Sequence, residues 1–175
     1  WHISHTKPTV EQSFPKGMTI PPEHPICTDG SGGYFSKEPR LRRCGWGWIQ
    51  LHTTEHTVPK ECYGGLHSKL QSVPRAEIQA LTYVLVAIEL SGIRDCTYHV
   101  HTDSFVAYKG ANRGKHYCRK TKQAAIWTQY WILQDKLTER KVNIVVHKVT
   151  AHITDVEIEK GEQSALDEAG NDGVD

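Results

Sequence analysis

Three acidic residues, Asp29, Glu77 and Asp103, stand where their carboxylates could act together. Asp29 ends a short apolar run before a glycine-rich turn, and Asp103 follows the alternating run 97–102. Both runs are typical of strands, and ligand sites in open α/β sheets gather at the carboxyl ends of strands. Glu77 lies four residues before Leu81, so it belongs to the apolar stripe of a helix that faces the sheet. The three carboxyls are therefore expected to converge on one side of a central sheet.

Converging carboxylates suit the binding of hard divalent cations. A carboxylate aimed at a sheet is unfavourable unless a cation neutralises it. Mg²⁺ prefers oxygen ligands and keeps waters and phosphate oxygens in its coordination shell. Two such ions roughly 4 Å apart can activate a water and stabilise the leaving oxygen of a phosphodiester. That arrangement needs about four carboxylates, some of them shared between the ions.

Each of these acids also has an ordinary structural interpretation. Asp29 could be a turn residue, because Asp is common beside glycine in turns. Glu77 could complement the dipole of the first helical turn. Asp103 could be the N-cap of a helix that follows it, with or without a second role.

The elements that must position these residues follow from periodicity and turn residues. Apolar residues recur at helical spacing between 81 and 88, and Pro74 suits a first helical position. The predicted elements are three strands, a helix, a strand, two helices and a strand, at 25–29, 43–51, 56–66, 74–91, 97–102, 104–109, 122–139 and 142–149. Consecutive strands with glycine-rich turns predict an antiparallel meander, and helical crossovers predict two further strands. The expected fold is an α/β mixed five-stranded sheet flanked by helices.

The two ends of the chain differ from this pattern. Residues 1–24 hold four prolines and no apolar periodicity, so we expect a lead-in or linker before a domain at 25–175. Residues 153–175 are acidic and are expected to form a loop that enters the start of a final helix.

Composition excludes several classes of protein. The chain of 175 residues has 21 Lys and Arg against 20 Asp and Glu, so any affinity for nucleic acid must come from local clusters. No apolar run approaches the roughly 20 residues of a membrane span, so we expect no membrane partner, and no secretory signal is visible. Five scattered cysteines indicate reduced thiols and an intracellular location, in nucleus or cytoplasm. His99 and His101 lie on one side of a predicted strand near Cys96, but their spacing matches no common zinc pattern.

Several short motifs resemble those of the ribonuclease H family, in order from about residue 25 to the last residue. They are 28–31 (Thr-Asp-Gly-Ser), 75–81 (Arg-Ala-Glu-Ile-Gln-Ala-Leu), 102–104 (Thr-Asp-Ser), 149–152 (Val-Thr-Ala-His) and 170–175 (Gly-Asn-Asp-Gly-Val-Asp). The run 41–47 (Leu-Arg-Arg-Cys-Gly-Trp-Gly) is similar to ribonuclease H domains of retroelement polyproteins. The resemblance implies a ribonuclease H-like fold and a metal-dependent endonuclease that cuts the RNA strand of RNA/DNA hybrids. It also implies two Mg²⁺ ions, or Mn²⁺ in their place, and a reverse transcriptase in the same polyprotein as a partner.

The resemblance also implies roles for individual residues. Asp29, Glu77, Asp103 and Asp175 would be the metal-binding carboxylates, with Asp29 shared between the ions, and His152 would aid proton transfer or product release. Residues near the hybrid would be Ser31, Arg75, Gln79, Ser104 and Asn171. The chain departs from the family in the 22 residues between His152 and Asp175, a longer stretch than usual. The family also continues into a helix where this chain ends, so a truncated final helix is expected. On so long a loop, His152 could instead be an ordinary surface histidine.

The segment 109–122 concentrates basic charge without any acid. Its cations are Lys109, Arg113, Lys115, Arg119, Lys120 and Lys122. We favour a loop that contacts phosphates of the substrate. The residues expected to bind these phosphates are Arg113, Lys115, Arg119, Lys120 and Lys122. The alternative is a solvated loop, which is the usual meaning of a charge run.

Two other functions remain open, because this fold also supports integrases, transposases and exonucleases. The first is another nuclease of the same superfamily. The second is a catalytically inactive domain that binds hybrids or acts as a scaffold.

Overall fold

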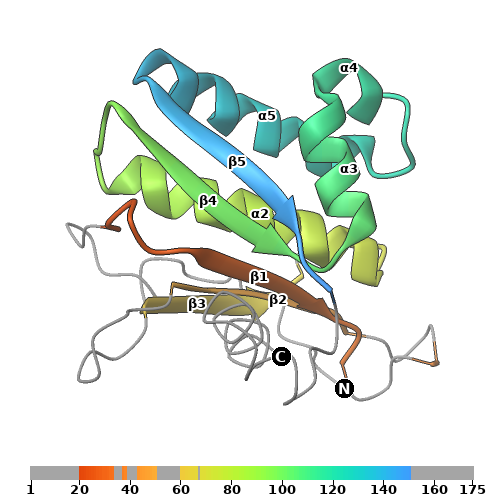
Figure 1. The fold of residues 1–175 in the computed structure, drawn as a ribbon. Helices are drawn as coiled ribbons and strands as arrows, with labels where there is room; N and C mark the ends of the chain where they lie inside the picture. The colour runs from red at the N-terminus through yellow and green to blue at the C-terminus, as the bar shows by residue number, and fades with distance from the viewer. Residues whose placement is uncertain (1–19, 34–36, 39–42, 51–59, 67, 151–175) are drawn as a thin grey trace.

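The structure is a computed structural model that describes residues 20–33, 37–38, 43–50, 60–66 and 68–150 (Figure 1). The strands of the first half are β1 (Ile26–Ser31), β2 (Gly45–Gln50) and β3 (Lys60–Gly65). They are followed by α2 (Val73–Leu90) and β4 (Cys96–Thr102). The second half continues with α3 (Phe105–Arg113), α4 (Lys115–Cys118), α5 (Ala124–Glu139) and β5 (Val142–Lys148).

The five strands form one mixed sheet in the order β3-β2-β1-β4-β5. The pairs β1–β2 and β2–β3 are antiparallel, while β1–β4 and β4–β5 are parallel. This topology confirms the predicted meander and the two added parallel strands. The parallel pairs require helical crossovers, which α2 and the segment α3–α5 provide.

Helices cover one face of this sheet, as Figure 1 shows for α2, α3 and α5. In β4 the side chains of Tyr98 and Val100 are buried in the core on this side, whereas His99 between them is exposed. This alternation follows from the two-residue period of a strand. Together with Trp48 and Trp127, which are also fully buried, these residues fix the sheet against the helices. Among the described residues, no helix is both long and apolar enough to cross a membrane.

Residues 20–24, within the expected lead-in, pack onto the domain. Ile20 is fully buried, and its carbonyl accepts a hydrogen bond from the Tyr98 hydroxyl. The Gln50 amide donates to the carbonyls of Pro21 (2.6 Å) and His24 (3.2 Å). This short segment is therefore tied to both β2 and β4.

The structure extends β1 beyond its predicted end at residue 29. Gly30 and Ser31 continue the antiparallel ladder opposite Trp46 and Gly45. The glycines predicted a turn, yet backbone pairing with β2 keeps the chain extended for two more residues.

The predicted basic loop at 109–122 is wrong, because most of that segment is helical. It comprises the end of α3, the short helix α4 and the turn before α5. Cys118 is buried, and its thiol donates to the carbonyl of Gly110 at 3.3 Å. A Cβ on Gly110 would lie 2.2 Å from the Trp127 ring, so this glycine permits α3 to approach α5 closely. Packing against α5 therefore orders a segment whose composition resembles a loop.

Candidate active site

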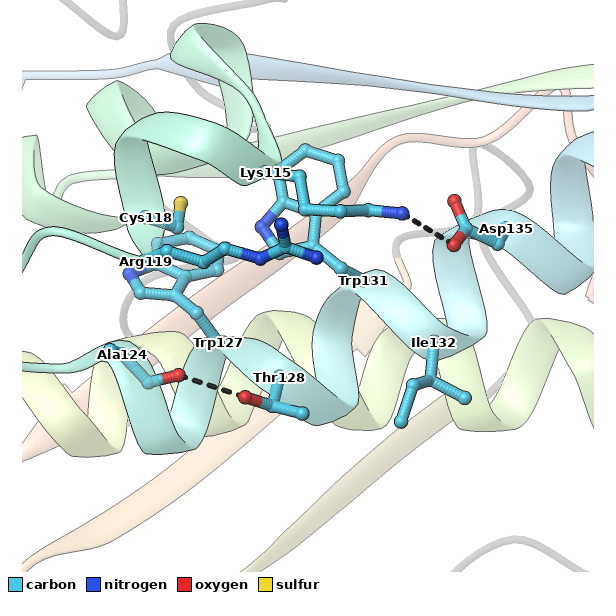
Figure 2. Close-up of a pocket in the computed structure, with 9 residues that line it drawn as sticks. All are labelled: Lys115, Cys118, Arg119, Ala124, Trp127, Thr128, Trp131, Ile132 and Asp135. Atoms are coloured by element: carbon cyan, nitrogen blue, oxygen red, sulfur yellow. Dashed lines mark hydrogen bonds and ion pairs between the residues drawn. The ribbon is translucent and has the colours of Figure 1, made fainter.

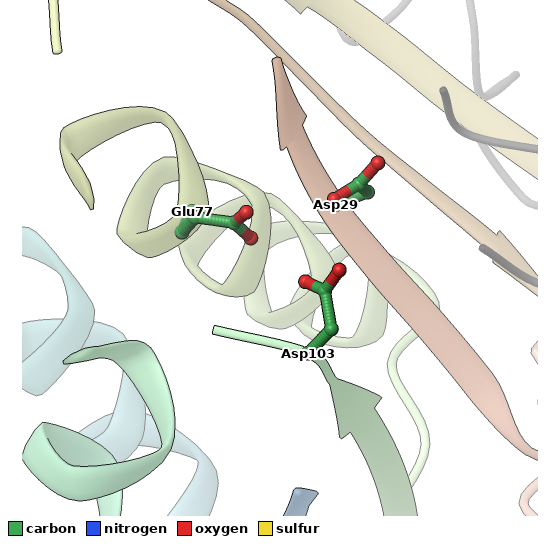
Figure 3. A group of neighbouring side chains, drawn as sticks. All are labelled: Asp29, Glu77 and Asp103. Carbon is green, nitrogen blue, oxygen red and sulfur yellow. The ribbon is translucent and has the colours of Figure 1, made fainter. Parts of the chain in front are cut away.

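Two of the three predicted carboxylates are placed by the parallel register of β1 and β4. Thr28 pairs with Thr102, so the next residues, Asp29 and Asp103, lie level with each other at the carboxyl ends of neighbouring strands (Figure 3). The Thr28 hydroxyl also donates to the His101 carbonyl at 3.5 Å, which links the same two strands.

The third carboxylate, Glu77, reaches this position because α2 approaches β1 closely. A Cβ on Gly30 would lie 2.7 Å from the backbone nitrogen of Glu77 and 3.0 Å from the carbonyl carbon of Ala76. Any larger residue at position 30 would push the helix away from the strand. The N–H of Gly30 also donates to the Glu77 carboxylate. From the sequence alone, Gly30 was interpreted only as part of a turn. Its position directly after Asp29 is the signal that could have indicated the close approach of α2 to β1.

The three carboxyls converge at one point, as the sequence predicted. One oxygen from each of Asp29, Glu77 and Asp103 lies within 4.8 Å of the other two (Figure 3). Asp29 and Glu77 are each only 5% exposed, and Asp103 is half-buried. These side chains come from a strand, a helix and the residue after a strand, so rigid elements hold the cluster in place.

The electrostatics of Glu77 fit a cation site. Burial and, to a smaller extent, the nearby charge of Asp103 raise the pKa of Glu77 to about 8, although the hydrogen bond from Gly30 opposes both effects. The Oε2 atom of Glu77 is buried and has no hydrogen-bond partner among the described residues. A buried carboxylate with an unpaired oxygen is unfavourable unless a cation compensates it. The donor set is all oxygen, which is the set that Mg²⁺ and Mn²⁺ prefer.

The ordinary interpretations of the three acids do not account for this geometry. Asp29 lies within the β1 ladder opposite Gly47 and is not in a turn. Glu77 is the fifth residue of α2, whose first turn contains no acid. The N-cap of α3 is Ser104, whose hydroxyl accepts from the Ala107 N–H at 3.2 Å, so Asp103 is left for another role.

Comparison with known proteins identifies the family. The model of the RNase H family matches residues 23–174. The chain belongs to the ribonuclease H family. This membership makes the protein a ribonuclease H enzyme. No match to a curated protein was found.

Solved structures of ribonucleases H share the fold at low sequence identity. LC9-RNase H1, a type 1 enzyme with the type 2 active-site motif, is 16% identical over 83% of this chain and 72% of its own, with a TM-score of 0.56. The RNase H domain of prototype foamy virus is 16% identical over 87% of this chain and 96% of its own, with a TM-score of 0.53. LC11-RNase H1, solved in complex with an RNA/DNA hybrid, is 19% identical over 83% of this chain and 98% of its own, with a TM-score of 0.50. The fold is thus common to cellular-type and retroviral ribonucleases H.

Four further described residues of this ribonuclease H were predicted to lie near substrate. Each of them is within two residues of Asp29, Glu77 or Asp103 in the sequence. Arg75 and Gln79 flank Glu77 on α2, and both are half-buried. The Arg75 guanidinium donates to the Ser68 hydroxyl at 3.4 Å. Ser31 ends β1, and its hydroxyl accepts from the Gly33 N–H at 3.1 Å. Ser104, the fourth residue, caps α3 and also donates its N–H to the Thr102 hydroxyl at 3.1 Å.

The cations of the segment 109–122 lie further along α3, on α4 and in the turn before α5. Helix α3 starts two residues after Asp103 and, with nine residues, is about 13 Å long. Arg113 lies over the Tyr117 ring at 5.1 Å. Lys115 forms an ion pair with Asp135 at 2.6 Å, across a pocket of about 240 Å³ between α4 and α5 (Figure 2). The remaining predicted phosphate ligands are exposed, and these are Arg119, Lys120 and Lys122.

Three predicted residues lie outside the part of the chain that the structure describes. They are His152, Asn171 and Asp175. Their assigned roles remain predictions from the motifs.

Proposed function

We propose that this ribonuclease H hydrolyses the RNA strand of RNA/DNA hybrids and uses two Mg²⁺ ions, or Mn²⁺ ions, to do so. The observation that carries the proposal is the convergence of Asp29, Glu77 and Asp103 within 4.8 Å. The burial and unpaired oxygen of Glu77 support a cation at this point. The likeness to LC11-RNase H1, which was solved with an RNA/DNA hybrid, supports the choice of substrate.

In this proposal the chain holds the ions and the substrate in a fixed arrangement. Asp29, Glu77 and Asp103 would hold the metals, with Asp29 shared between them and Asp175 as the fourth ligand. Bound divalent cations supply an activated water and charge stabilisation for the leaving oxygen. Because Asp29, Glu77 and Asp103 come from rigid elements, little rearrangement of these three is needed when substrate binds. His152 moves a proton near the scissile phosphate or aids release of the product.

Specificity for RNA then depends on contacts around the cluster. The 2′-hydroxyl distinguishes RNA from DNA at a given position. Side chains that we assign to the hybrid backbone or minor groove are Ser31, Arg75, Gln79, Ser104 and Asn171, while those assigned to phosphates are Arg113, Lys115, Arg119, Lys120 and Lys122. A reverse transcriptase is the expected partner, since the 41–47 run resembles retroelement sequences and the foamy virus domain shares the fold. The cysteines, which form no disulfide in the described part of the chain, favour an intracellular setting.

The test is cleavage of end-labelled nucleic acids of one sequence. The RNA/DNA hybrid is compared with single-stranded RNA, duplex RNA and duplex DNA, each with Mg²⁺ and with a chelator. We expect cleavage of the RNA strand of the hybrid alone, and only with Mg²⁺. Cleavage of duplex DNA at the same rate would indicate another nuclease activity. Hybrid binding without cleavage in either Mg²⁺ or Mn²⁺ would indicate an inactive binding domain.

A further inference from the structure

A second cluster of potential metal ligands lies on the sheet, and its nearest member on β4, His101, is two residues before Asp103 of the acidic cluster. His99 and His101 share one face of β4, and His147 of β5 pairs with His101 in the parallel register. The Nδ1 atom of His99 lies 2.8 Å from the Nε2 atom of His147. The ring of His101 stacks on that of His147 with centroids 4.9 Å apart. His147 of β5 thus contacts both His99 and His101 of the neighbouring strand.

The strand period decides which residues belong to this cluster. Residues 97, 99 and 101 share one face of β4, and residues 96, 98, 100 and 102 share the other. Cys96, which the sequence places near the histidines, interacts instead with Tyr98 on the opposite face. The third member of the cluster is His147 and not Cys96. His147 is 46 residues further along the chain than His101, and the sequence alone did not connect it with His99 and His101.

The cluster opens into a cleft with further donors. The cleft has a volume of about 470 Å³, and Glu23 and His24 line it together with the three histidines. A water occupies roughly 30 Å³ in the liquid, so the cleft has room for an ion with water ligands. Lys148 also lines the cleft, but its ammonium donates to the Val149 carbonyl at 2.8 Å.

We propose that His99 and His147 chelate a transition-metal dication such as Zn²⁺, with His101, Glu23 or water completing the coordination. Two Zn–N bonds of about 2.0–2.1 Å at a tetrahedral angle put the two nitrogens roughly 3.3 Å apart. The observed 2.8 Å is the distance of a hydrogen bond between the imidazoles, so the rings need to separate by about half an ångström and to turn until both nitrogen lone pairs face the ion. The proton between them leaves the coordinating nitrogen for the other nitrogen of the same ring or for water, so both imidazoles bind as neutral ligands.

This site differs from the acidic cluster in the ions that it selects. Imidazole nitrogens favour Zn²⁺, Cu²⁺ and Ni²⁺, whereas carboxylates and water suit Mg²⁺. Because His101 lies two residues before Asp103, which directly follows β4, the two sites are only about 7 Å apart along the chain. The proposal does not depend on the nuclease activity, since the histidines bind whether or not the acidic cluster is catalytic.

The experiment measures Zn²⁺ binding to the 175-residue chain by competition with a chromophoric chelator in excess Mg²⁺, which occupies carboxylate sites. We expect one Zn²⁺ per chain. His99→Ala and His147→Gln should each weaken binding by about ten-fold or more, because even outer-sphere partners of metal ligands contribute ten- to hundred-fold. Asp29→Asn should leave it unchanged. His116→Ala is the matched control, because His116 is an exposed histidine outside the cluster.

Substitution of Co²⁺ supplies a second readout, since its visible absorption is much stronger in a four-coordinate protein site than in the hydrated ion. We expect the bound-Co²⁺ spectrum to disappear in His99→Ala and to persist in Asp29→Asn and His116→Ala. Thermal unfolding without metal checks that the variants fold, and the exposed position of His99 makes loss of the fold unexpected. The proposal is overturned if the parent chain shows no Zn²⁺ binding in Mg²⁺. It is equally overturned if His99→Ala and His147→Gln bind as tightly as the parent, or if Asp29→Asn abolishes binding.

Discussion

The acidic cluster and the basic segment carry opposite charges and are also built in opposite ways. Asp29, Glu77 and Asp103 come from three elements that are distant in sequence, and two of them are almost fully buried. The cations of 109–122 come from one continuous stretch, and Arg119, Lys120 and Lys122 remain exposed. The buried acids are fixed in position before any ligand arrives, whereas the exposed cations keep their side-chain freedom and their hydration.

This difference separates two contributions to function. Charges held in a water-poor, rigid site interact strongly with an ion or a reacting group, so their removal affects the chemical step. Exposed cations interact with phosphates through a screened field, so their removal affects binding and its salt dependence. The acidic cluster should therefore control turnover, and the basic segment should control affinity.

The most severe test of this separation is Asp29→Asn. The amide has the shape of the carboxylate but lacks the charge to hold cations, so hybrid cleavage in Mg²⁺ should fall by about 1,000-fold or more. Hybrid binding should stay within about two-fold of the parent, because the phosphate-contacting cations are untouched. Single-turnover cleavage and equilibrium binding measure the two quantities separately.

Asp135→Asn is the matched control for this substitution. It makes the same chemical change at an exposed carboxylate on α5, and we expect normal cleavage at saturating hybrid. Undiminished cleavage by Asp29→Asn would show that the acidic cluster is not the catalytic centre.

The second test concerns the stability of the metal-free protein and uses Glu77→Gln. The pKa of Glu77 is about 8 in the folded chain and 4.5 when it is unperturbed, so the folded state keeps a proton that the unfolded chain releases. The stability from this group is therefore complete below about pH 4.5 and is lost as the pH rises towards 8. The loss is on the order of 4 kcal/mol at 1.36 kcal/mol per pH unit. Urea unfolding with a chelator, from about pH 5 to pH 8, should show a flatter profile for the variant.

Glu139→Gln, at an exposed glutamate of α5, should leave the parent's profile unchanged. In saturating Mg²⁺ the parent should lose much less stability between about pH 5 and pH 8, because a bound cation favours the ionised carboxylate. A Glu77→Gln profile that overlays the parent's without metal would mean that Glu77 is ionised and already compensated in the folded chain.

The sequence predicted the acidic cluster well because local patterns carried most of the information. Strand periodicity placed Asp29 and Asp103 at the carboxyl ends of two strands, and helix periodicity placed Glu77 on a face directed at the sheet. The parallel pairing of β1 and β4 then brings the three carboxyls together. The cap of α3 was less certain, because Asp103 and Ser104 are both good N-cap residues. Only the hydrogen bond from the Ala107 N–H to the Ser104 hydroxyl decides between them.

The sequence predicted the basic segment less well because its structure depends on distant partners. Gly110 and Gly114 are weak helix formers, so propensity favours a loop. The helical state instead comes from the packing of Gly110 against Trp127 and from the burial of Cys118. The pairing of His147 with His101 was likewise hidden, because it depends on the register of β4 and β5.

The third test removes three exposed cations from the basic segment. Arg119→Ala, Lys120→Ala and Lys122→Ala in one chain should weaken hybrid binding by about ten-fold at moderate salt. They should also flatten the log–log salt dependence by about two to three, because roughly 0.9 is lost per phosphate contact. Cleavage at saturating hybrid should stay close to that of the parent.

The control removes three exposed cations at the other end of β4 and β5. These are Arg94, Lys136 and Lys141, and their loss changes the net charge equally. We expect a much smaller change in the salt dependence, because a general field effect is screened beyond about 10 Å at 0.1 M salt. Equal effects of the two triple variants would show that the basic segment is an ordinary solvated surface.

The smallest expected effect concerns Lys115, a cation of the basic segment that also forms an ion pair within the protein. Its ammonium is 2.6 Å from Asp135, and the two side chains are 40% and 59% exposed (Figure 2). A surface pair of this kind contributes about 0.2–1 kcal/mol to stability. Asp135→Asn should therefore reduce stability only slightly, while it frees Lys115 to bind a phosphate. We expect hybrid affinity to rise two- to three-fold, on the order of 0.5 kcal/mol, at low salt.

A double-mutant cycle with Lys115→Ala separates this effect from the removal of a negative charge. If Lys115 contacts phosphate, the gain from Asp135→Asn should be smaller once Lys115 is absent, because the carboxylate no longer has a cation to withhold from the hybrid. Raising the salt should abolish the gain, since both the ion pair and the phosphate contact are screened at this exposed site. An equal gain with and without Lys115 would mean that Asp135 acts only as a repelling charge. Lys115 would then be a residue that joins α4 to α5, and the phosphate-binding surface would be confined to the exposed cations that follow it.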